Sequence, residues 1–115
     1  GGSYGALFSP QSSKILFNSG NKLTVYDFEK DETTAILDIG VEAKLANTAW
    51  LSESVIVAMA GDKNLVRIKT TGAKDIININ QASLPANITN ILSDNSSVYI
   101  IGDTGVFAVG IDKII

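Results

Sequence analysis

Short apolar runs recur along the chain, and each is bounded by glycine or by polar residues typical of turns. One set is almost wholly apolar, the pattern of strands buried on both faces: Ile15–Phe17, Val55–Ala60 and Val98–Ile101. A second set follows a few residues later: Leu23–Phe28, Leu65–Ile68 and Val106–Val109. The first two members of this second set alternate apolar and polar side chains, as half-exposed strands do. We expect each pair of runs to form an antiparallel hairpin.

A glycine followed by a turn-forming residue stands between the two runs of each pair. The side chain of that residue can accept a hydrogen bond from the backbone of the turn. The pairs, spaced by 41 residues in both intervals, are Gly20-Asn21, Gly61-Asp62 and Gly102-Asp103. These six positions are the predicted structural turn residues, and their constant spacing indicates an internal repeat.

Further strands extend each repeat on either side of its hairpin. A third element lies upstream of each hairpin: Gly5–Ser9, Asn47–Ser52 and Ile88–Ser93. A fourth follows in the first two repeats only: Thr34–Ile39 and Asp75–Ile79. Val41–Ala46 permits a helix but is too short to form one alone, so we interpret it as a connector.

Four short antiparallel strands in about 40 residues are typical of one blade of a β-propeller. The predicted fold class is therefore all-β, with about three such blades forming a partial β-propeller. The predicted blades span residues 4–40, 45–80 and 86–115, and residues 1–3 (Gly-Gly-Ser) look like a linker or tag remnant. The alternative is a β-sandwich, in which the same short strands pack as two sheets.

The first repeat resembles a blade of the WD40 family. Ala6–Pro10 matches its strand and serine-proline turn, Lys14–Asn21 its strand and glycine turn, and Leu23–Phe28 its strand ending in Trp-Asp, here Tyr26-Asp27. The chain departs from the family in having no histidine, and the second and third repeats lack the aspartate after that strand. The resemblance implies a non-enzymatic scaffold that binds other proteins through its loops and blade surfaces.

Three blades are too few to close a ring, because closed propellers use four to eight. An open array leaves an apolar face at each end. The array can be completed by another part of a longer chain, by a partner subunit or by self-association, for instance of two copies into a six-bladed ring. We therefore expect a protein partner or additional blades.

Composition narrows the functional classes for these 115 residues. The formal net charge is −3 and the nine basic residues are scattered, which argues against nucleic acid as a partner. The absence of cysteine and histidine removes disulfides, thiolate ligands and the commonest general base. No signal peptide or transmembrane segment is visible, so we leave the cellular compartment open and favour the cytoplasm.

No catalytic, cofactor-binding or metal-binding residues are predicted. The densest acidic cluster, Asp27 to Glu32, falls in a connection between strands and is interpreted as a solvated turn. The triplet Asp103-Thr104-Gly105 also occurs in aspartic proteases, so a homodimeric protease using Asp103 is a remote alternative. A cell-surface adhesive or carbohydrate-binding sandwich module is the other alternative. Tyr26 and Trp50 are predicted to pack in the core or to contact a partner.

Overall fold

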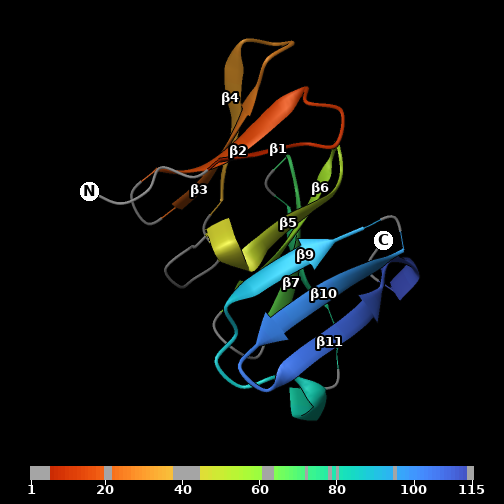
Figure 1. Ribbon diagram of the computed structural model, residues 1–115. Helices are drawn as coiled ribbons and strands as arrows, with labels where there is room; N and C mark the ends of the chain where they lie inside the picture. The colour runs from red at the N-terminus through yellow and green to blue at the C-terminus, as the bar shows by residue number, and fades with distance from the viewer. Residues whose placement is uncertain are drawn as a thin grey trace.

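The chain forms antiparallel β-sheets joined by turns and short 3-10 helices (Figure 1). The computed structural model describes residues 6–19, 22–37, 45–60, 64–71, 73–77, 79, 81–94 and 96–113. Over these ranges it contains sheets of four, four and three strands, and none of them closes into a barrel. The prediction of an all-β fold is confirmed.

Each sheet is a meander in which strands that follow one another in sequence lie side by side. Sheet one consists of β1 (Ala6–Phe8), β2 (Lys14–Ser19), β3 (Lys22–Asp27) and β4 (Glu32–Leu37). Sheet two consists of β5 (Thr48–Ser52), β6 (Val55–Ala60), β7 (Asn64–Lys69) and β8 (Lys74–Ile77). Sheet three consists of β9 (Asn90–Ser93), β10 (Ser97–Gly102) and β11 (Gly105–Gly110). The 3-10 helices are η1 (Leu45–Asn47), η2 (Gln81–Ser83) and η3 (Ile111–Lys113).

The strands lie close to where the apolar runs predict them. Each predicted repeat contains one sheet, and the third repeat has no fourth strand over the residues described. The boundaries differ by one or two residues, as at β9, which begins at Asn90 instead of Ile88. The connector predicted at 41–46 lies outside the described residues except for its last two positions, which belong to η1.

Sheet two is packed on both of its faces by the other two sheets. Because successive side chains along β6 point to opposite faces, Ile56 and Ala58 both point toward sheet one, where they pack in one core with Leu16 and Val25. The intervening side chain, Val57, packs instead with residues of sheet three such as Ile100. Because β6 is buried on both faces, it has the continuous apolar sequence Val-Ile-Val-Ala-Met-Ala.

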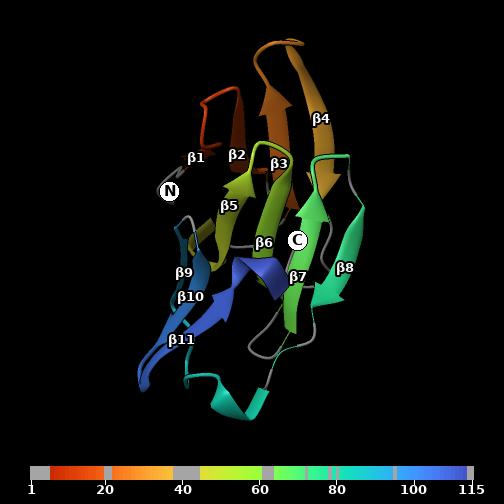
Figure 2. The same cartoon turned by 90° about the vertical axis from the view of Figure 1, so that its right-hand side faces the viewer.

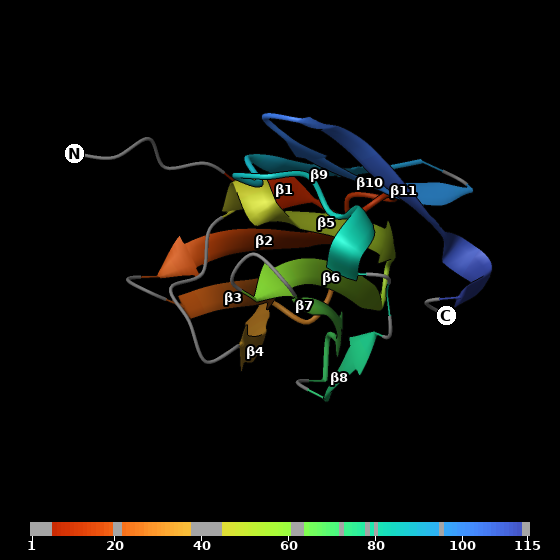
Figure 3. The same cartoon turned by 90° about the horizontal axis from the view of Figure 1, so that it is seen from below.

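The first strands of the three sheets, β1, β5 and β9, lie next to one another, whereas β4 and β8 lie on the far side (Figures 2 and 3). Trp50 joins these first strands by hydrogen bonds in two directions. Its Nε1 donates to the carbonyl oxygen of Leu7 at 2.9 Å, and its own carbonyl oxygen accepts from Ser93 Oγ at 2.7 Å. Both partners are 43 residues from Trp50, so the repeat in sequence is matched by a repeat in the contacts.

A β-sandwich does not describe this arrangement. A sandwich has two layers that share one core, whereas here sheet two separates two apolar cores. The predicted alternative fold is therefore wrong for the described residues, and the third sheet is the reason.

Candidate functional site

An open groove runs along the first strands of the three sheets and has a volume of about 310 Å³. Its lining is mainly apolar, with hydroxyl groups at intervals: Leu7, Phe8, Pro10, Thr48, Ala49, Trp50, Ile91, Leu92 and Ser93. Trp50 is buried in the floor at 7% exposure, while Phe8 and Leu92 are 58% and 56% exposed. The groove thus offers apolar surface contributed by every sheet.

No other sheet in the described part of the chain covers one face of sheet one, called here its free face. Phe8, Ile15 and Tyr26 lie on it, pair in register and point away from sheet two. An aromatic cluster lies on this face. The ring of Phe28 stacks against Phe8 with centroids 6.1 Å apart and meets Tyr26 edge-on at 5.5 Å. Phe28 is 48% exposed, so this cluster presents aromatic surface to solvent.

The hydroxyl of Tyr26 donates a hydrogen bond to Asp31 Oδ1 in the following turn. This bond to a carboxylate, helped by desolvation and by the negative charge of Asp31, raises the pKa of Tyr26 above its ordinary value. The phenol therefore stays neutral at physiological pH and holds the aromatic cluster to the β3–β4 turn.

Sheet three has the second free face, defined by Leu92, Tyr99, Val106 and Ala108. Leu92 and Tyr99 are register partners, as are Tyr99 and Ala108, and all lie opposite to Ile100, which packs against sheet two. Val106 is 63% exposed. No sheet of the described part of the chain covers this face.

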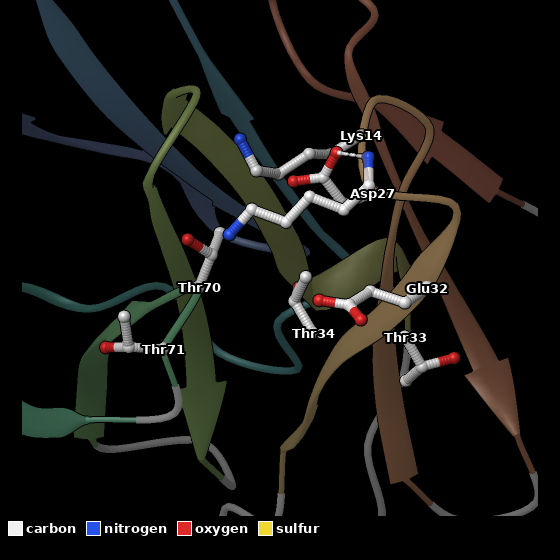
Figure 4. A pocket seen from close by; sticks show the side chains of 8 residues that line it. Lys14, Asp27, Glu32, Thr33, Thr34, Thr70 and Thr71 are labelled. Carbon is white, nitrogen blue, oxygen red and sulfur yellow. Dashed lines mark hydrogen bonds between the residues drawn. The ribbon is translucent and has the colours of Figure 1, made fainter.

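A polar cleft of about 300 Å³ lies where the β3–β4 turn of sheet one approaches the β7–β8 turn of sheet two (Figure 4). Glu32 and Thr34 of β4 point toward Thr70, and Thr33 points to the other side of the strand, as alternation requires. The remaining lining side chains are Lys14, Asp27, Lys30 and Thr71. The cleft therefore brings opposite charges and hydroxyl groups close together.

Asp27 lies in this cleft and is 5% exposed. Its Oδ1 accepts hydrogen bonds from the backbone N–H groups of Glu29 at 2.9 Å and Lys30 at 3.2 Å. These bonds shape the turn after β3, which is the role that short acidic side chains commonly have in such turns. No three His, Cys, Asp or Glu side chains among the described residues are grouped in a way that could hold a metal ion.

Glu53 ties the first turn of sheet one to the first turn of sheet two. Its carboxylate accepts from Ser9 Oγ at 2.7 Å, from the backbone N–H of Gln11 at 2.7 Å, and from Ser13 Oγ. Desolvation acts to raise the pKa of Glu53, but the bonds from Ser13, Gln11 and Ser9 outweigh it and lower the pKa below its ordinary value. The sequence gives no sign of this role, because a glutamate in a two-residue turn is normally solvated.

The corresponding turn of sheet three is closed by its own residues. Asp94 accepts from the backbone N–H groups of Ser96 and Ser97, both at 2.8 Å, and from the hydroxyl of Tyr99 at 2.7 Å. The bond from Tyr99 and those from the backbone lower the pKa of Asp94 to about 2. The same bond raises the pKa of Tyr99.

Four of the predicted turn residues, Gly20, Asn21, Gly61 and Asp62, lie outside the described residues. Gly102 is the last residue of β10 and Asp103 the first of a two-residue hairpin loop. The backbone N–H of Asp103 donates to the carbonyl oxygen of Ala86 at 2.8 Å, and Asn87 Nδ2 donates to Asp103 Oδ2 at 2.9 Å. The hairpin is thereby attached to the segment that precedes β9. Its acidic residue is exposed, and the protease alternative stays a prediction.

Gly102→Ala is expected to destabilise the protein by about 1 to 2 kcal/mol, because an added Cβ would overpack a tight contact. A Cβ at this position would lie 2.5 Å from the carbonyl oxygen of Ala86 and 3.0 Å from Pro85 Cβ. Gly110→Ala is the matched control, since its Cβ would meet only the end of the flexible Asp112 side chain. Urea unfolding of both variants tests this. Equal unfolding midpoints would show that the backbone at Ala86 shifts to accommodate the added methyl group at little cost.

Comparison with known proteins adds no family. No protein-family model matches the chain, and no curated protein matches it in sequence. In the described part of the chain, no helix is long and apolar enough to cross a membrane.

Proposed function

We propose that this chain is a non-enzymatic protein-binding scaffold, one section of an array of WD40-like β-propeller blades. Another part of the same protein or a partner subunit completes the array. The observation that carries this proposal is a contrast among the described residues. Sheet two is packed on both faces, whereas each outer sheet has one face with exposed apolar side chains that no other described sheet covers.

The residues on the free faces support binding of protein. Phe8 and Phe28 on sheet one, and Leu92 and Val106 on sheet three, are all about half exposed or more. Contiguous apolar surface of this kind is uncommon on a monomeric protein and typically marks an interaction site. Aromatic side chains in particular contribute strongly to protein interfaces.

The repeated contacts support an array that continues beyond the sheets seen here. Sheet two meets sheet one through one face and sheet three through the other. An array that continued past sheet three would cover the free face of that sheet. An array that continued past sheet one, at the opposite end, would cover the free face of sheet one. A further sheet at either end would bury apolar surface as the internal contacts do.

Affinity capture from extracts of the source organism tests this proposal with charge substitutions on the two free faces. We expect Phe8→Glu or Val106→Glu to reduce capture of the specific partner by at least about tenfold, because a charge would be buried in the interface. Ile76→Glu is the matched control: Ile76 is 71% exposed, but it lies on β8 of sheet two.

The partner identified in this way is then purified and titrated against the same variants. Loss of binding on substitution of either face, with binding retained by Ile76→Glu, supports the scaffold. Identical capture by the wild type and both face variants would contradict it, and so would the absence of any specifically captured protein.

A further inference from the structure

Sheets one and two both contribute side chains to the polar cleft between the β3–β4 turn and the β7–β8 turn (Figure 4). These two sheets follow one another in the chain, and each has four strands. The cleft has a volume of about 300 Å³, which lies at the lower end of the range for small-molecule sites. The ligand that it could hold is therefore a small molecule.

Charges of both signs line this cleft in equal number. The ammonium groups belong to Lys14 and Lys30, and the carboxylates belong to Asp27 and Glu32. Within the described part of the chain, no ion pair joins any of these four side chains to another residue. A simple anion or a simple cation would be attracted by half of these charges and repelled by the other half. The balance of charge therefore favours a ligand that carries both signs.

The carboxylate of Asp27 is buried, but the protein uses only one of its oxygens. Oδ1 accepts hydrogen bonds from the backbone N–H groups of Glu29 and Lys30. No described residue donates a hydrogen bond to Oδ2. A buried carboxylate oxygen is costly unless a donor from a ligand or from water reaches it. Asp27 therefore offers an acceptor for the cationic part of a ligand.

Thr70 lies directly after β7 and contributes a second buried polar group to the cleft. Its residue exposure is 9%, and its backbone N–H donates to the carbonyl oxygen of Ser54 at 3.0 Å. Its side-chain hydroxyl has no hydrogen-bond partner among the described residues. Buried hydroxyl groups without a partner are uncommon in proteins. Thr70 therefore offers a hydrogen bond to a ligand from the side of sheet two.

Lys14 lies beside Asp27 on the opposite wall of the cleft. The two residues are register partners on β2 and β3, so both side chains leave the same face of sheet one. Lys14 is half-buried, and its ammonium group can donate three hydrogen bonds but accept none. A cationic donor and an anionic acceptor are thus placed side by side. This arrangement is complementary to a ligand whose two opposite charges are also close together, as they are on the α-carbon of an amino acid.

We propose that the polar cleft binds a small zwitterion, a free α-amino acid. The carboxylate of the ligand accepts hydrogen bonds from the ammonium group of Lys14 and the hydroxyl of Thr70. Its ammonium group donates to Oδ2 of Asp27, and the exposed carboxylate of Glu32 adds attraction at the rim. This inference does not rest on the scaffold function, since the cleft lies apart from the free faces of sheets one and three.

Titration with L-alanine, followed by NMR of the isotope-labelled protein, tests the proposal. We expect saturable shifts of the amide signals of Asp27, Lys30 and Thr70, with a Kd of about 1 mM or tighter. Propionate and ethylamine are the matched control ligands, because each lacks one of the two charged groups of alanine. Each should bind at least about tenfold more weakly, since it leaves one set of charges in the cleft without a partner.

Substitutions in the cleft locate the site. Lys14→Gln should weaken alanine at least about tenfold, because it removes a charged donor. Thr70→Val keeps the shape of the side chain without the hydroxyl and should weaken alanine about three- to tenfold. Lys22→Gln is the matched control: it removes the same charge from an exposed residue at the other end of β3, outside the cleft lining, and should leave binding unchanged.

Several results would overturn the proposal. The first is binding of propionate or ethylamine as tight as that of alanine, which would mean that the cleft takes a simple ion. The second is the absence of saturable shifts with alanine, or shifts that lie away from the cleft. The third is equal weakening by Lys14→Gln and Lys22→Gln, which would reflect the total charge of the protein. The control ligands need no substitution, so the test stands even if a variant does not fold.

Discussion

Trp50→Ala is expected to lower the free energy of unfolding by about 3 to 5 kcal/mol, the range for removing a large buried aromatic side chain. Trp50 is 7% exposed and packs in the core between sheets one and two, beside Ile56 and Leu16. Its indole also bonds to the carbonyl oxygen of Leu7, so the substitution leaves a cavity and removes a link between β5 and β1. Urea unfolding followed by circular dichroism measures the loss.

Trp50→Phe separates the packing from the hydrogen bond. Phenylalanine keeps most of the apolar surface but leaves the Leu7 carbonyl without the indole N–H, which should cost about 1 to 2 kcal/mol. Leu92→Ala is the control on a neighbouring strand, because Leu92 is 56% exposed and its truncation should change stability little. An unfolding midpoint for Trp50→Ala equal to that of the wild type would show that the first strands are held together by other contacts.

The apolar pattern predicts the strands well because burial acts locally on each strand. β6 is covered on both faces, and its six apolar residues are visible as a continuous run. The constant 41-residue spacing of Gly20, Gly61 and Gly102 in the sequence is matched by one two-stranded hairpin in each sheet: β2 with β3, β6 with β7 and β10 with β11. The sequence predicts the ends of strands less well. At β9, for example, the residues beside Asn90 are equally compatible with a strand and with a loop.

The surfaces that we propose to bind protein could be predicted only in part. The sequence places Phe8 in a strand, but which face of that strand is free depends on the order in which the sheets pack. The sequence predicts that Trp50 packs in the core or contacts a partner, and the structure places it in the core. Its bonds to Leu7 and Ser93 connect residues 43 positions apart, which no local pattern specifies.

Glu53 is the clearest example of a contact that the sequence does not predict. Its partners Ser9, Gln11 and Ser13 lie 40 to 44 residues earlier in the chain. Only the packing of sheet two against sheet one brings them together. In the sequence alone, Glu53 and Ser54 form a polar turn like any other, so the contact between turns is visible only in three dimensions.

Glu53→Ala is expected to destabilise the protein by about 2 to 3 kcal/mol at pH 7, since hydrogen bonds to a charged group contribute more than neutral ones. The substitution leaves two serine hydroxyls and one backbone N–H in the facing turn without their acceptor. Glu29→Gln is the control, because Glu29 is an exposed acidic residue in the turn after β3. A double-mutant cycle with Ser13→Ala should give a coupling of about 1 kcal/mol.

Lowering the pH should remove the stabilisation that the Glu53 carboxylate contributes to the folded protein. Because the folded protein lowers the pKa of this carboxyl below its ordinary value of 4.5, the stabilisation is complete above that value. It is then lost as the pH falls through the lower pKa of the folded state. The difference in unfolding free energy between the wild type and Glu53→Ala should therefore shrink below about pH 4.5. Asp94 also titrates at low pH, but it is present in both proteins and cancels in the comparison. A difference that stays constant from pH 7 into this acid range would mean that the carboxylate charge does not hold the two turns together.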